Sequence, residues 1–194
     1  MRENISMKQQ DSEQLALKML SNDLSDVRMV GQSIDRIFDK EGRLVKEIVG
    51  HNQVVNTFLN LVMCLMKQEG GYKGIQYWAV GSGASSWDTN MPIPAVGATA
   101  LTYEISRVAL VDGDISFLDS NYNKISTPSN ILQISHTFGL DDCNGEWREF
   151  GLFGGNATAS ANSGIMINKR HHGVITKTNE MTVERVMRFT LSLV

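Results

Sequence analysis

The chain has 194 residues, with 18 Lys and Arg against 21 Asp and Glu, so its formal net charge is −3. Its length suits one domain with a sizeable core, and 42% hydrophobic residues are too many for a disordered chain. The charge balance lacks the basic excess on which binding to a phosphate backbone depends. No apolar run reaches the roughly 20 residues of a membrane-spanning helix. We therefore expect a soluble globular protein with neither nucleic acid nor membrane as a partner.

Residues 1–25 are polar and contain one short segment, residues 12–21, whose leucines and methionine form an imperfect helical stripe. We predict that residues 1–25 form an N-terminal arm or a short appended helix, and that residues 26–194 form the main domain. The first residues lack the apolar core of a secretion signal, so we expect synthesis in a cytoplasm. The two cysteines, Cys64 and Cys143, are too few for a disulfide scaffold, and we expect Cys64 to be a small core residue.

The next segments predict a hairpin followed by a helix. Apolar residues over 27–38 and 44–49 flank the connection 39–43, whose glycine allows the positive φ of a short hairpin loop. Over 54–66 the apolar residues recur at spacings of one, three or four, which predicts a helix of about four turns that ends near Gly70. Its apolar face is so wide that we expect a sheet or a neighbouring subunit to cover most of the helix.

The rest of the chain has the patterns of strands. Apolar residues stand at alternate or consecutive positions in four segments: 75–80, 101–106, 132–138 and 181–193. These strands follow one another at short intervals without intervening helices, which favours antiparallel pairing over a parallel α/β sheet. The predicted fold class is therefore mainly β (α+β): an antiparallel β-sandwich-like domain with one long helix packed on the sheet and a polar N-terminal arm.

A long loop over residues 82–100 separates two of the predicted strands. Loops of this length inside a compact domain are usually functional or folded against another part of the protein. We predict an interface in this loop, at Trp87, Met91 and Pro92.

Motifs that carry chemistry are weak in this sequence. The turn Gly81-Ser82-Gly83 lacks the third glycine that opens the helix of a nucleotide-binding site. Adjacent histidines in a strand point to opposite faces, so we expect His171 and His172 to be surface residues; a metal ion shared between subunits is the alternative. The acidic cluster over 141–146 misses the spacing of an EF-hand, which favours an ordinary turn over a calcium site. A catalytic pair of carboxylates stays open, because sequence spacing does not fix their separation in space. We expect a non-enzymatic protein with no cofactor and no metal.

Several short segments, read in order, resemble a family of tailed-bacteriophage virion proteins, described as tail fibre, tail or baseplate-associated structural proteins. The resemblance covers about residues 27–194. It rests on a Gly-His-Asn segment before a helix, an AVGxG strand end, a Glu-x-x-Arg strand, a Glu-Phe-Gly-Leu-Phe segment and a closing strand. In this chain these are Gly50-His51-Asn52, residues 79–83, Glu104 to Arg107, Glu149 to Phe153 and residues 181–193.

The resemblance implies a non-enzymatic building block that assembles into a homo-oligomer and contacts other virion proteins. Its place would be the virion, after synthesis in the host cytoplasm. Two other functions stay open: a decoration or connector subunit of the head or neck, and a carbohydrate-binding module for host recognition with Trp87 as a stacking platform.

The motif residues have ordinary structural explanations. We expect Gly81, Gly83 and Gly151 to adopt backbone conformations that are closed to residues with side chains. Glu104 and Arg107 are three apart, so in a regular strand they point to opposite faces and would find partners elsewhere, such as Arg148 or Glu149. Three apolar residues of the last motif are candidates for the core: Phe150, Leu152 and Phe153.

Overall fold

The computed structural model describes residues 27–193, and the arm predicted for residues 1–25 lies outside them. The chain separates into two compact units. Within the described residues, the unit formed by residues 1–29 and 191–194 contributes the start of the first strand and the end of the last strand. The unit formed by residues 30–190 holds the features described below.

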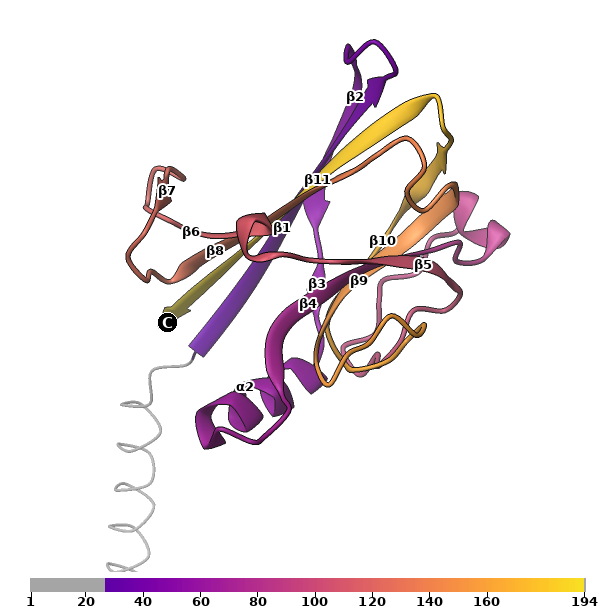
Figure 1. The fold of residues 1–194 in the computed structure, drawn as a ribbon. Coiled ribbons are helices and arrows are strands. Elements are labelled where there is room, and N and C mark those ends of the chain that lie inside the picture. The colour runs from indigo at the N-terminus through magenta and orange to yellow at the C-terminus, as the bar shows by residue number, and fades with distance from the viewer. Residues whose placement is uncertain (1–26, 194) are drawn as a thin grey trace, which may run out of the picture. The chain divides into compact units, whose positions relative to one another are not determined.

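Two antiparallel sheets pack together, as predicted from the strand pattern (Figure 1). The six-stranded sheet has the order β2-β1-β11-β8-β6-β7 and the five-stranded sheet the order β3-β10-β9-β4-β5. The bounds are β1 Val27–Asp39, β2 Leu44–His51, β6 Ile115–Leu118, β7 Lys124–Ile125, β8 Ile131–Phe138 and β11 Met181–Leu193 in the first. In the second they are β3 Gln53–Val54, β10 Ile165–Lys177, β9 Gly145–Gly155, β4 Lys73–Gly81 and β5 Glu104–Ala109. The short 3-10 helices η1 Ser85–Asp88 and η2 Asp112–Asp114 lie in connections.

Aromatic side chains join the two sheets. Phe138 of the six-stranded sheet makes edge contacts with Trp78 and Trp147 of the five-stranded sheet, at ring-centroid distances of 6.3 and 5.0 Å. All three are fully buried. The alternation predicted for the last strand holds at Val183, Met187 and Phe189, which are buried. It fails at two positions, because Leu191 is 46% exposed and Val186, on the other side of the strand, is buried. The face of the five-stranded sheet that carries Trp78 is called the inner face here, and the opposite face the outer face.

The outer face is also covered, by loops and by Val55, which lies just before the helix. A second apolar cluster lies there, made of Val55, Ala79, Leu101, Phe153, Ala157 and Met166. The five-stranded sheet is therefore buried on both faces, and polar side chains on its outer face must find partners within the protein.

The helix α2, Thr57–Lys67, packs mainly on β10. It is shorter than the helix predicted over 54–66, since Gln53 and Val54 pair with β10 as strand β3. It ends at Gln68, which adopts the left-handed conformation at φ 58°, two residues before the predicted Gly70. Within the helix only Leu61 is buried, so the sheet does not give the wide cover that the apolar pattern predicted. Cys64, predicted in the core, is only partly buried.

Candidate functional site

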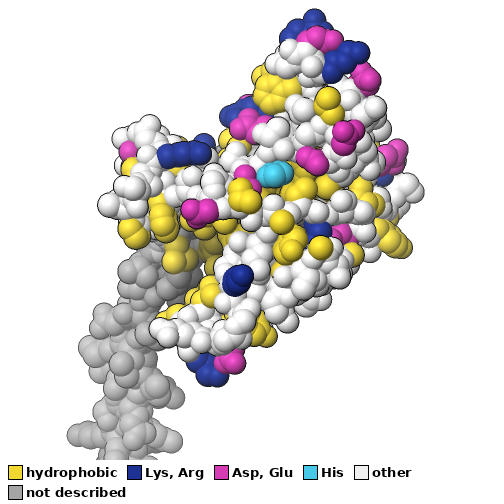
Figure 2. All heavy atoms as spheres, viewed as in Figure 1, with side chains coloured by type: hydrophobic (Ala, Val, Ile, Leu, Met, Phe, Trp, Pro, Cys, Tyr) yellow, Lys and Arg dark blue, Asp and Glu magenta, His cyan; other side chains and the backbone are white. Residues whose placement is uncertain are grey.

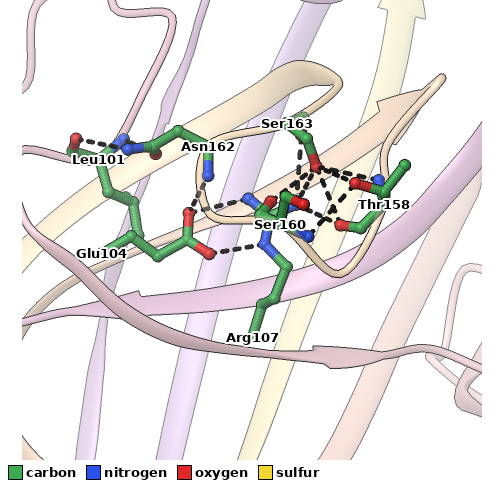
Figure 3. A network of polar contacts seen from close by, with 7 residues as sticks. All are labelled: Leu101, Glu104, Arg107, Thr158, Ser160, Asn162 and Ser163. Atoms are coloured by element: carbon green, nitrogen blue, oxygen red, sulfur yellow. Dashed lines mark hydrogen bonds and ion pairs between the residues drawn. The ribbon is translucent and has the colours of Figure 1, made fainter.

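The residues of the Glu-x-x-Arg motif lie side by side on the outer face, which corrects the prediction that they point to opposite faces. Arg107 donates two hydrogen bonds to the Glu104 carboxylate, at 2.6 and 2.8 Å (Figure 3). Both side chains are almost fully buried, at 3% and 1% exposed. The cause is a β-bulge in β5. Val80 pairs with Ser106, but the next residue, Gly81, pairs with Glu104, so Ile105 has no pairing partner on β4. This extra residue shifts the side-chain alternation by one position.

This ion pair holds the loop between β9 and β10 in place. The Arg107 guanidinium donates to the carbonyl oxygens of Thr158 and Ser163, at 2.9 and 3.2 Å. Glu104 accepts the backbone N–H of Asn162 at 2.7 Å, and the Asn162 side chain accepts the N–H of Leu101 at 2.9 Å (Figure 3). The motif therefore fastens two loops to the sheet edge.

Glu149, one of the two partners predicted for this pair, belongs to another cluster. Glu149 is fully buried on the outer face, accepts the backbone N–H of Tyr103 at 2.8 Å and lies 2.9 Å from the ammonium of Lys169. Lys169 also donates to the carbonyl oxygen of Ala100 and to the hydroxyl of Thr102. The end of the long loop is thus fixed by buried charge.

The start of the long loop is fixed by Arg148. Its guanidinium donates two hydrogen bonds of 2.8 Å to Asp88, and a third of 2.8 Å to Glu146. Hydrogen bonding from Arg148 lowers the pKa of Asp88, so the carboxylate stays ionised to lower pH than a free Asp does.

The predicted interface residues lie in this anchored loop. Trp87 is half-buried and its ring stacks on the ring of His171 at 4.0 Å between centroids. His171 Nδ1 donates to the carbonyl oxygen of Pro92 at 2.8 Å. One face of Trp87 is therefore occupied, whereas Met91 is 46% exposed and Ile93 88% exposed. The apolar side chains that the loop presents to solvent follow Trp87 in the sequence.

His172 is buried, and His171 is partly buried with 6% of its side chain exposed, which corrects the prediction that they are surface residues. They do point to opposite faces: His171 lies on the outer face under the loop, and His172 lies on the inner face beside Arg185. Burial lowers the pKa of both, for His172 to about 3, so both rings are neutral at pH 7. The cause is the cover on both faces of β10, which no local pattern reports.

A buried ion pair lies between the sheets. Arg185, on β11, donates two hydrogen bonds to Asp35, on β1, and both residues are fully buried. The Arg185 guanidinium also lies 4.0 Å from the ring centroid of Phe150. Arg170 donates to the hydroxyl of Ser33 nearby, and burial lowers its pKa. This cluster was missed, although Arg185 interrupts the apolar side of its strand.

The last motif builds the sheet itself. Phe150, Leu152 and Phe153 are fully buried, as expected of core residues. A side chain at Gly151 would place its Cβ 2.7 Å from the carbonyl oxygen of Asn168, so the neighbouring strand excludes it.

The acidic cluster forms a turn, as predicted. Asp142 accepts the backbone N–H of Gly139 at 2.8 Å, and the Asn144 side chain donates to the carbonyl oxygen of Leu140. Within residues 27–193, no three His, Cys, Asp or Glu side chains gather in a way that suits a metal ion. In the same residues, no helix has the length and apolar character needed to span a membrane.

An apolar stripe on α2 is exposed to solvent. Leu59, Met63 and Met66 are 61%, 62% and 74% exposed. Their spacings of four and three residues place them on one side of the helix, here called the α2 stripe. In Figure 2, charged side chains crowd the end of the β1–β2 hairpin, whereas hydrophobic side chains form patches elsewhere on the same face.

Comparison of the chain with protein-family models, curated proteins and solved structures found no match.

Proposed function

We propose that the chain is a non-enzymatic structural subunit of a tailed-phage virion, in the tail, baseplate or tail fibre, and that it acts by packing on a second copy of itself and on other virion proteins. The observation that carries the proposal is the α2 stripe. Monomeric proteins rarely leave a contiguous set of long apolar side chains in water, and such patches mark surfaces where proteins associate. The occupant is a second copy, in line with the homo-oligomer implied by the sequence resemblance.

The way the motifs are used supports the same function. The Glu104–Arg107 pair fastens loops, and the segment around Gly151 fills the core. Both build a rigid scaffold, and neither leaves a reactive group facing solvent. A rigid scaffold with an apolar stripe suits a protein whose work is to pack against neighbours.

The test of this proposal replaces the three apolar side chains of the α2 stripe with polar ones. The triple variant Leu59→Gln, Met63→Gln, Met66→Gln removes apolar surface from exposed helix positions and keeps good helix formers there. We expect its mass by light scattering to be that of a monomer, with an unchanged melting temperature, whereas the unaltered chain gives an oligomer.

The chain offers a matched control on β2, where three apolar residues are exposed to a similar degree: Leu44 55%, Val45 66% and Val49 55%. Replacing these three with Thr should leave the oligomer intact. Loss of the oligomer in the control alone would move the interface to β2 and refute the role of the α2 stripe.

A head or neck subunit would use the same stripe. Copurification with capsids after removal of the tails would place the protein there, and copurification with tails supports the proposal.

A further inference from the structure

A pocket of about 220 Å³ lies on the solvent side of the six-stranded sheet. Its lining is Val30, Gln32, His51, Tyr122, Arg188 and Thr190. Gln32 and His51 are direct cross-strand partners on β1 and β2, so they share one face of the sheet. Arg188 and Thr190 alternate with the buried Met187 and Phe189 on β11, and therefore face outward. The pocket is therefore lined by three strands and one turn. Its volume is below the range of pockets that hold drug-sized ligands, about 300–1,000 Å³.

Arg188 is the charged group of this pocket. Its Nε donates to the side-chain oxygen of Gln133 at 2.8 Å, and its guanidinium lies 4.6 Å from the ring centroid of Tyr122. Five of the seven other arginines in residues 27–193 pair with a carboxylate: Arg36, Arg43, Arg107, Arg148 and Arg185. Within residues 27–193, no carboxylate lies at ion-pair distance from Arg188. A guanidinium held in this way presents its remaining N–H groups as a fork that matches a carboxylate.

Tyr122 forms the wall of the pocket. It lies in the turn between β6 and β7 and has φ 64°, a conformation that few residues other than glycine adopt. The turn is held by Asp119, which accepts the backbone N–H groups of Asn121 and Asn123 at 2.8 and 2.9 Å. The Asp119 carboxylate is therefore engaged by its own turn, and the Tyr122 ring, 51% exposed, is held beside Arg188. A bulky side chain in a strained position at the rim of a pocket suggests a role for the ring.

We propose that this pocket binds a sugar acid, a ligand in which a carboxylate stands on a ring of hydroxyl groups. Arg188 takes the carboxylate. The amide of Gln32, the hydroxyl of Thr190 and the imidazole of His51 offer hydrogen bonds to hydroxyl groups. The Tyr122 ring offers an apolar surface to the C–H groups of the sugar. The ligand is either a free sugar acid or one residue of an acidic polysaccharide, and the inference does not rest on the assembly proposal.

The experiment is an NMR titration of the full chain with galacturonate, with oligogalacturonate, and with galactose and acetate as controls. Galacturonate or its oligomer should shift the amide signals around the pocket, whereas galactose and acetate should bind at least about tenfold more weakly, since each lacks one half of the contacts. Binding of the monomer indicates a free sugar acid, and binding of the oligomer alone indicates a polysaccharide; both results support the proposal.

Two variants test the residues. Arg188→Gln should weaken binding by about tenfold to a hundredfold, the usual effect of losing a charge-assisted hydrogen-bonded pair. Tyr122→Gly removes the ring and accepts the positive φ without strain, so it should weaken binding without lowering the melting temperature. The matched control is Arg36→Gln, which removes one positive charge from the same face of the six-stranded sheet, where Arg36 pairs with Glu47 and Glu184. Equal binding by Arg188→Gln and the unaltered chain, equal binding of acetate and galacturonate, or no shifts at millimolar ligand would overturn the proposal.

Discussion

Replacing Asp35 with Asn should destabilise the protein strongly. Asp35 and Arg185 are both fully buried, and the guanidinium also lies against the rings of Phe150 and Trp147, at 4.0 and 5.3 Å. Without the carboxylate, a positive charge is left between the sheets with no opposite charge. Removing one partner of a buried ion pair costs about 3–5 kcal/mol, a large share of the roughly 5–15 kcal/mol that stabilises a typical domain.

The assay is urea unfolding followed by tryptophan fluorescence, which reports on all three tryptophans, among them Trp147 beside the ion pair. The matched control is Lys40→Gln. Lys40 and Glu180 lie at the ends of the same two strands and form an ion pair of 3.0 Å, but they are 58% and 63% exposed. Exposed pairs contribute less than about 1 kcal/mol, so the control should unfold almost like the unaltered chain. Equal unfolding midpoints for the two variants would show that the buried ion pair contributes no more to stability than the exposed one.

Two further predictions concern the histidines and the long loop. Burial holds the pKa of His172 at about 3, below its ordinary 6.5, so the unfolded chain binds more protons between these values and the free energy of unfolding should fall as the pH drops below about 6.5. Urea unfolding at neutral and acidic pH should show a smaller dependence in a His172→Gln variant, and an identical dependence would contradict the assignment. Gly83 has φ 56°, and a Cβ there would lie 2.5 Å from the Trp87 ring, so Gly83→Ala should displace this ring from His171 and raise hydrogen exchange in the loop. Gly97→Ala, which meets no atom within 4 Å, is the control and should exchange as the unaltered chain does.

The parts of the fold that follow from local patterns could be predicted. The alternation in the last strand identified its buried side, because neighbouring side chains in a strand point in opposite directions whatever the partner strand. The short intervals between strands indicated antiparallel pairing, because parallel strands need a long crossover connection, usually a helix. The start of the helix was wrong, since Val54 has an apolar side chain that suits either structure and its pairing with Asn168 decides in favour of a strand.

The features that depend on distant pairing could not be predicted. Glu104 and Arg107 share a face because of a bulge opposite Val80 and Gly81, and the sequence around them has no pattern that predicts this bulge. The His171 side chain is covered because the ring of Trp87, which is distant in the sequence, stacks on it. One signal was available for the buried ion pair: Arg185 lies on the apolar side of its own strand, and a charge at such a position needs an opposite charge facing it.

Sedimentation velocity on the full chain, over a wide range of concentrations, tests whether the α2 stripe packs on a second copy. We expect one species whose mass is a fixed multiple of the chain mass, and its conversion to the monomer when Leu59, Met63 and Met66 are replaced with Gln. A single species with the mass of the monomer at the highest concentration would contradict the claim that the α2 stripe packs on a second copy.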